Sequence, residues 1–126
     1  MIRILIFIVL SSFALIGCSQ KYVFAKFHMA QADEAFYKAH KLRIKKGAEE
    51  KRLKYYRDAC SHFKQAYQLE PKFFTLYNID SAIEACTRMN DFESKEIFQE
   101  FQEQYVQEHP VEAENGDAGT ELLAPE

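Results

Sequence analysis

Histidine and carboxylate side chains are the groups of this chain best suited to bind metals or transfer protons, and their spacing argues against both roles. Two zinc ligands on one helix are commonly four residues apart, and no such pair occurs among His28, His40, His62 and His109. Acidic residues such as Glu84, Glu93 and Glu96 fall at helical spacing, which is typical of a solvated helix face. The chain also has no glycine-rich phosphate loop and no nucleophile elbow. We therefore predict no catalytic residue, no metal site, no cofactor and no enzymatic activity.

The first 18 residues have the composition of an export signal. Arg3 precedes the apolar stretch Ile4–Ile16, which is shorter than the roughly 20 residues that span a bilayer comfortably. The motif Leu15-Ile16-Gly17-Cys18 then closely resembles the bacterial lipoprotein box. The resemblance implies cleavage before Cys18, diacylglycerol on its thiol and a further acyl chain, such as palmitate, on its freed amine. In that family Ser19, in place of aspartate, implies delivery to the outer membrane.

The resemblance divides the chain into four parts. We expect a signal peptide over 1–17, a lipidated tether over 18–21, a helical domain over 22–110 and a tail over 111–126. The tail contains Gly116, Gly119, five acidic residues and no basic one, so it is predicted to be disordered. An uncleaved anchor over the first segment, or a simple buried thiol at Cys18, is the alternative.

Charge is distributed unevenly, although the net charge is only −3. Residues 21–57 carry 11 Lys and Arg against 4 Asp and Glu, whereas residues 58–126 carry 4 against 15. For an exported, lipid-anchored protein, the basic half predicts attraction to anionic lipid rather than to nucleic acid, which we do not expect as a partner. The basic residues concerned are Lys21, Lys26, Lys38, Lys41, Arg43, Lys45 and Lys46.

Apolar residues recur every three or four positions, which predicts an all-α fold. Gly47 and Pro71 are the only helix breakers between residues 30 and 109. We expect helices over about 22–47, 53–69, 73–86 and 92–108. Asn90 or Asp91 is predicted to cap the last of them.

One segment resembles a known repeat. The stretch from Tyr56 to Pro71 is similar to the second helix of a tetratricopeptide repeat, with the small Ala59, the packing pair Phe63 and Ala66, and a terminal Leu-Glu-Pro. The resemblance implies a right-handed array of two antiparallel helical hairpins over about residues 27–110. The two prolines that end the units are 39 residues apart, against a family repeat of about 34. An ordinary four-helix bundle is therefore the alternative.

The repeat resemblance also implies a binding surface for a peptide or protein of the cell envelope. Carried over by position, its contact residues are Phe74, Tyr77, Asn78, Ser81 and Ala85, with Asn78 hydrogen-bonding the ligand backbone. Simple packing of Phe74 and Tyr77 is the alternative. Because repeat arrays bury their faces by stacking, self-association is also open.

The predicted function is thus a non-catalytic outer-membrane lipoprotein that acts as an interaction scaffold. Two other functions remain open: binding of a small hydrophobic or aromatic ligand between the helices, and a purely structural role in the envelope. The aromatic residues that would line such a ligand pocket are Phe36, Tyr56, Phe63, Tyr67 and Tyr77.

Cys60 and Cys86 fall on consecutive antiparallel helices of an exported chain. A turn at Pro71 places Cys60 opposite about Ala82, so Cys86 lies one helical turn, about 6 Å, further along. That offset is near the limit of disulfide geometry. A disulfide and two buried free thiols are both open.

Overall fold

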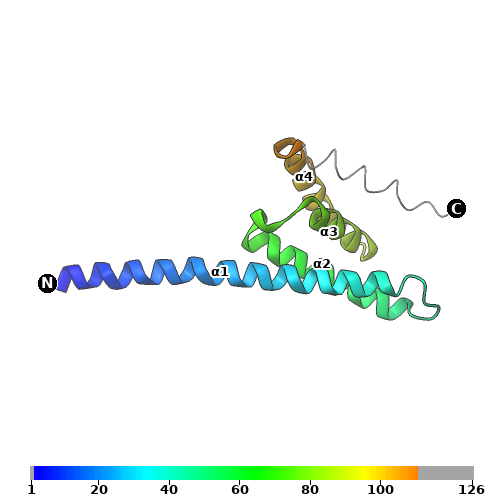
Figure 1. The fold of residues 1–126 in the computed structure, drawn as a ribbon, viewed down its shortest axis with the longest axis horizontal. Coiled ribbons are helices and arrows are strands. Elements are labelled where there is room, and N and C mark those ends of the chain that lie inside the picture. Colours follow the sequence, from blue (N-terminus) through cyan, green and yellow to red (C-terminus); the bar gives the residue numbers. More distant parts are fainter. Residues whose placement is uncertain (1, 111–126) are drawn as a thin grey trace.

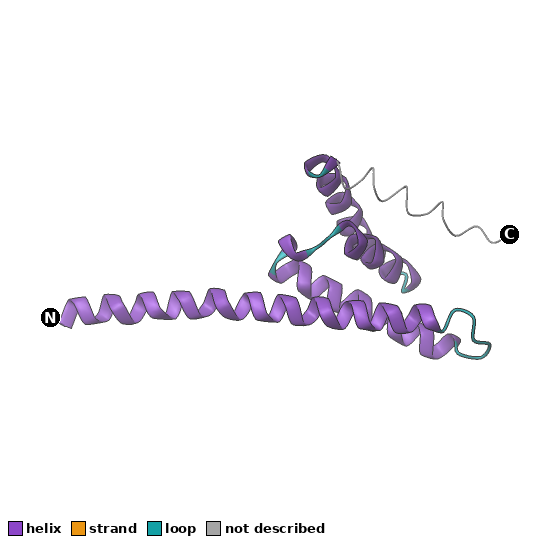
Figure 2. Ribbon diagram, in the orientation of Figure 1, coloured by secondary structure: helices purple, strands orange, loops and turns teal. Residues whose placement is uncertain are grey.

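The structure is a computed structural model that describes the backbone of residues 2–110 and the side chains of residues 20–110. The described residues form four α-helices and a short 3-10 helix, η1, and contain no strand (Figure 2). The order is α1 (Ile2–Lys41), α2 (Glu49–Leu69), η1 (Pro71–Phe73), α3 (Leu76–Arg88) and α4 (Phe92–Glu108). The all-α prediction is confirmed, and the predicted tail over 111–126 lies outside the described residues.

The helices pack as two hairpins, α1 with α2 and α3 with α4, and α2 joins the two. Figure 1 shows α1 as the longest element, with α3 and α4 together on one side of it. The N-terminal half of α1 extends well beyond the other helices, and α2 runs beside the C-terminal half. Hairpin packing is therefore correct as predicted.

Helix α1 begins at Ile2 and continues without a break to Lys41. The segment predicted as a tether, 18–21, is helical, and no helix begins at Tyr22. The reason is that Gly17 is the only weak helix former at the junction, and one glycine costs a helix only about 1 kcal/mol relative to alanine. The helical domain is thus joined to the segment that ends at Cys18 by continuous helical backbone.

The predicted helix ends and turns are largely correct. Gly47 has a positive φ of 78° and lies in the turn between α1 and α2, a conformation that glycine adopts without strain. Pro71 follows the end of α2 at Leu69 and opens η1. Asn90 also has a positive φ, 56°, so it ends α3, and Asp91 is the residue that caps α4, by accepting a hydrogen bond from the Ser94 backbone N–H.

Helix α3 begins later than predicted. Pro71 starts η1, which takes Phe73 out of the following helix. The Thr75 hydroxyl accepts a hydrogen bond from the Asn78 backbone N–H, and the Asn78 side chain accepts one from the Thr75 backbone N–H. These reciprocal bonds satisfy two helix-terminal donors and fix the start of α3 at Leu76.

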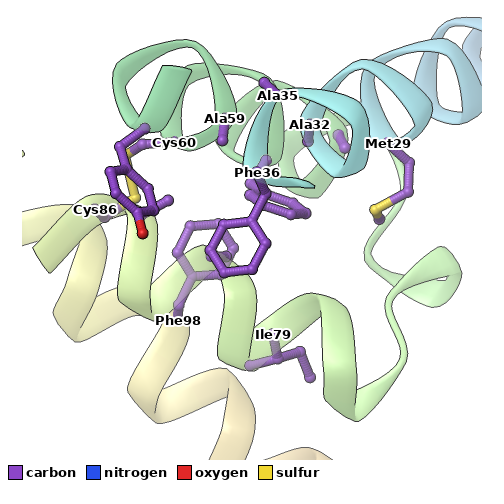
Figure 3. Packing of buried hydrophobic residues seen from close by; sticks show 14 of the residues in the cluster. Met29, Ala32, Ala35, Phe36, Ala59, Cys60, Ile79, Cys86 and Phe98 are labelled. Atoms are coloured by element: carbon purple, nitrogen blue, oxygen red, sulfur yellow. A yellow bond between two sulfur atoms is a disulfide. The ribbon is translucent and has the colours of Figure 1, made fainter. Parts of the chain in front are cut away.

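One apolar core joins all four helices (Figure 3). Fully buried alanines, Ala32 and Ala39 of α1 with Ala59 of α2, allow the backbones of the first hairpin to approach closely. The large side chains that fill the rest include Phe63 of α2 and Phe98 of α4. Cys60 and Cys86 lie at one end of this core.

Cys60 and Cys86 form a disulfide in the structure, with their Cα atoms 5.0 Å apart. Of the two alternatives that the sequence leaves open, the structure therefore has the bridge. It fastens α2 to α3, at the junction of the two hairpins.

Removing this bridge should destabilise the fold. Its partners are separated by 26 residues, and closing a loop of that size stabilises a domain by about 3 kcal/mol. We expect the Cys60→Ala/Cys86→Ala variant to lose free energy of unfolding of that order, measured by urea unfolding followed by circular dichroism. Dithiothreitol should shift the wild-type midpoint and leave that of the variant in place; an unshifted wild-type midpoint would contradict the prediction.

Candidate functional site

The five predicted partner-binding residues do not share one exposed surface. Phe74, Asn78, Ser81 and Ala85 are all buried, and only Tyr77, with an exposed fraction of 65%, is open to contact. The assignment of the other four to a binding face is corrected here. Asn78, Ser81 and Ala85 lie on the side of α3 that the other helices cover, and Phe74, just before α3, packs against rings of α2 and α4.

Asn78 uses its side chain within the chain. Its Oδ1 accepts hydrogen bonds from the Thr75 backbone N–H at 3.1 Å and from the Thr75 hydroxyl at 2.8 Å. Its Nδ2 donates to Asp33 Oδ1 of α1 at 2.9 Å. Burial raises the pKa of the Asp33 carboxyl, and this hydrogen bond opposes the rise. Asn78 therefore connects α3 to α1, and its buried side chain is not open to a ligand backbone in the way we predicted.

Phe74 and three of the aromatic residues predicted to line a ligand pocket are part of the packed core. Phe74 packs against Phe63, Phe98 and Phe101, with ring centroids 5.7–6.1 Å apart. Phe36, Tyr56 and Phe63 are each at most 6% exposed. They form the core in place of lining a ligand cavity, and Tyr77 lies apart from them on the surface.

A hollow does exist elsewhere, between η1 and the C-terminal end of α4. Its volume is about 530 Å³, and rings of Phe74, Phe101 and Tyr105 form part of its wall. Its remaining lining residues are Glu70, Pro71, Lys72, Glu108 and His109. Sequence reasoning missed this hollow, because its wall combines residues 70–74, which precede the late start of α3, with residues near the end of α4.

Glu84 is the centre of a polar cluster on three helices. The Tyr56 hydroxyl of α2 donates to Glu84 Oε1 of α3 at 3.4 Å, and Arg88 lies 3.9 Å from the same oxygen. His40 Nε2 of α1 lies 3.4 Å from it but makes no hydrogen bond. Burial, followed by the Glu84 charge, raises the pKa of the Tyr56 hydroxyl. Glu84 thus accepts the hydrogen bond of a buried tyrosine hydroxyl, which gives this carboxylate a structural role.

The structure brings two distant histidines together. Nδ1 of His28 in α1 lies 2.9 Å from Nδ1 of His62 in α2. In a hydrogen bond between two Nδ1 atoms, one of them must be an acceptor without a hydrogen. The ring that accepts is therefore neutral, so at most one of the two rings is positively charged. Sequence analysis did not predict the pair, because its members are 34 residues apart.

One three-residue group in the described part of the chain has potential metal-ligand atoms close together, namely Cys60, Cys86 and Asp91. The thiolate is the form of cysteine that binds metals, and both sulfurs are held in the disulfide. Asp91 is already occupied, because it caps α4 and lies 3.1 Å from Lys64 Nζ. Its hydrogen bond from Ser94, and then the one from Lys64, hold the pKa of this carboxyl below its usual range. The group therefore acts as a cross-link and a cap.

Comparison with known proteins gives no further guide. No family model matches the chain, and neither a curated protein nor a solved structure matches it. Within the part of the chain searched, no helix is both long and apolar enough to cross a membrane.

Replacing Asn78 should weaken the fold. Asn78→Ala removes a helix cap and the hydrogen bond to the half-buried Asp33 carboxyl, so the free energy of unfolding should fall by about 1–2 kcal/mol. The neighbouring Tyr77→Ala is the matched control. Tyr77 is 65% exposed, and its loss should change stability by less than about 0.5 kcal/mol. Urea unfolding of both variants measures the difference, and equal effects would contradict the assignment.

The histidine pair should make stability depend on pH. Burial, and then the charge of His62, lowers the pKa of His28, so the unfolded chain binds this proton more readily than the folded chain. Stability should be full above about pH 6.5 and fall as the pH drops below it. We expect the loss between about pH 7.5 and 5.5 to be smaller in His28→Asn than in the wild type. Thermal unfolding at both pH values tests this, and an unchanged pH difference would count against it.

Proposed function

We propose that this chain is a lipid-anchored, non-catalytic interaction module of the bacterial cell envelope, with a tetratricopeptide-like arrangement of its two hairpins. The observation that carries the proposal is the motif Leu15-Ile16-Gly17-Cys18 at the end of an apolar segment. Acylation of Cys18 with two or three chains would hold the protein stably on a membrane, since each buried CH₂ contributes about 0.8 kcal/mol. The outer membrane is the location that Ser19 favours.

The position of the motif relative to the domain supports this role. Ala25, seven residues after Cys18, is fully buried, so the folded domain begins about 10 Å along the helix from the acylated residue. Because the connecting backbone is helical, the anchor would hold the domain close to the headgroups. The basic residues predicted to attract lipid, which include Lys21 and Lys26, are exposed.

Fewer observations support a partner-binding surface than support the lipid anchor. Of the residues carried over from the repeat family, Tyr77 on α3 remains available for contact. A small-ligand pocket has less support, because Phe36, Tyr56 and Phe63 are part of the core. A purely structural role would need neither partner nor ligand, so capture of partners in the native envelope separates it from the scaffold role.

The proposal predicts that Cys18 carries the label when cells grow with radioactive palmitate. Cys18→Ser should abolish labelling, move the protein out of the membrane fraction and remove the proteins crosslinked to it in intact envelopes. Cys60→Ala/Cys86→Ala is the matched cysteine control and should keep the label. Labelled Cys18→Ser protein, or unchanged fractionation, would overturn the anchor; an anchored protein without specific crosslinks would overturn the scaffold role alone.

A further inference from the structure

Helix α1 has apolar side chains on two opposite faces. One face is the buried stripe that packs into the core and includes Ala25, Ala32 and Ala39. Outside this stripe α1 also has exposed apolar residues: of nine large hydrophobic residues that are exposed in the described part of the chain, five lie on α1. The five are Tyr22, Val23, Phe24, Phe27 and Tyr37, and Val23, Phe27 and Tyr37 lie opposite the buried stripe.

The exposed residues follow a helical register. Val23, Phe27, Ala30, Glu34, Tyr37 and Lys41 follow one another at steps of three or four residues and are all exposed. The Glu34 charge is paired with Lys38 Nζ, 2.5 Å away. They form one stripe, which we call the outward face of α1. Val23 is nine residues, about two and a half turns, before the buried Ala32, so the outward face points away from the core.

Lysines border this face. Lys41 Nζ lies 4.9 Å from the centre of the Tyr37 ring. Lys26 lies on the flank of α1 that is nearer to η1, because its Nζ is 4.8 Å from the centre of the Tyr22 ring and 5.8 Å from that of Phe73. Apolar rings alternating with lysines, whose long side chains carry the charge to the edge of the face, are typical of helices that lie in a membrane interface.

Charge distinguishes this side of the molecule from the other. Residues 21–57, which include the outward face and the following turn, carry 11 basic and 4 acidic residues. Described residues 58–110 carry 4 basic and 10 acidic ones, and Figure 1 shows α3 and α4 together on one side of α1. Each lysine or arginine close to an anionic bilayer is attracted by about 1 kcal/mol, so the basic half favours the lipid surface and the acidic hairpin favours solvent.

We propose that the outward face of α1 is a membrane-binding surface, on which the helix lies flat against anionic lipid. This inference rests on the proposed function, because acylated Cys18 belongs to the same helix and brings the face to the bilayer. The rings of Phe27 and Tyr37 enter the boundary between headgroups and acyl chains, about 5–10 Å deep. Lys26 and Lys41 bind the anionic headgroups beside them.

Orientation separates this arrangement from simple tethering. Tyr37 is 19 residues after Cys18, about 28 Å along the axis. If α1 stood upright on its anchor, Phe27 would lie closer to the bilayer than Tyr37, and Tyr37 would be in solvent. If α1 lies flat, the two rings are at the same depth.

Tryptophan reporters can measure this depth, because the chain has no Trp of its own. We would purify the acylated protein as Phe27→Trp, Tyr37→Trp and Phe92→Trp variants. Phe92, on α4, is the matched control because its exposed fraction of 58% is close to the 59% of Tyr37. Each variant is reconstituted into phosphatidylcholine–phosphatidylglycerol vesicles whose lipids carry bromine near the top of the acyl chains. Quenching of the tryptophan emission then reports contact with that depth.

We expect strong and similar quenching of Phe27→Trp and Tyr37→Trp, and none of Phe92→Trp. Adding Lys26→Gln and Lys41→Gln to Tyr37→Trp, or using pure phosphatidylcholine, should reduce the quenching while the anchor keeps the protein on the vesicles. Quenching of Phe27→Trp alone would show an upright helix and overturn the proposal, as would no quenching in either reporter. Blue-shifted emission of both reporters before vesicles are added would assign the face to a second copy and also overturn it. The intact mass of the purified protein reports acylation separately, so failure of the anchor is distinguishable from failure of the face.

Discussion

The packing of α2 against three other elements is the constraint on which the rest of the structure depends. Its Tyr56 contacts Phe36 of α1, with ring centroids 6.0 Å apart. Cys60 is bonded to Cys86 of α3, and Tyr67 meets Phe98 of α4 at 5.6 Å. Because the buried positions of α2 recur every three or four residues, its one apolar face must serve all three contacts. Loss of α2 packing would therefore separate the two hairpins as well as open the first.

This constraint also explains why polar groups occur at the hairpin junction. Two helices that meet only through alanine and aromatic side chains can slide along each other, whereas directional bonds select one register. The bond between Asn78 and Asp33 connects α3 to α1, whereas the Tyr56–Glu84 bond and the disulfide both connect α3 to α2. Together they fix how the second hairpin sits on the first, so that the basic side of α1 stays free.

Local signals in the sequence were sufficient for much of the fold. The bounds of α4, the stop at Pro71 and the turn at Gly47 all follow from helix propensity, proline geometry and glycine freedom, which act within a few residues. The start of α3 was missed because Asn78 replaces the usual Glu or Gln of a capping box, so its pairing with Thr75 did not stand out.

The candidate site was much harder to predict. Periodicity identifies which residues share a helix face, but it does not say which neighbour covers that face. Asn78 and Asp33 are 45 residues apart, and His28 and His62 are 34 residues apart, so these contacts depend on how the hairpins meet. The repeat resemblance assigned Asn78 to a ligand, whereas Asp33 of α1 occupies that amide. Of the five predicted contact residues, Tyr77 alone lies on an uncovered face.

The same reasoning bears on α1. A helix at the surface of a soluble domain is expected to have one apolar and one polar face, and α1 departs from this pattern between Val23 and Lys41. A free domain with such a weakly apolar second face would bind membranes poorly. An acylated chain differs, because tethering keeps the face at an effective concentration near the millimolar range, so a contact that is weak in solution is occupied. The two proposals therefore give the anchor and the outward face complementary roles: the acyl chains supply the affinity, and the rings and lysines of α1 set the orientation of the domain on the membrane.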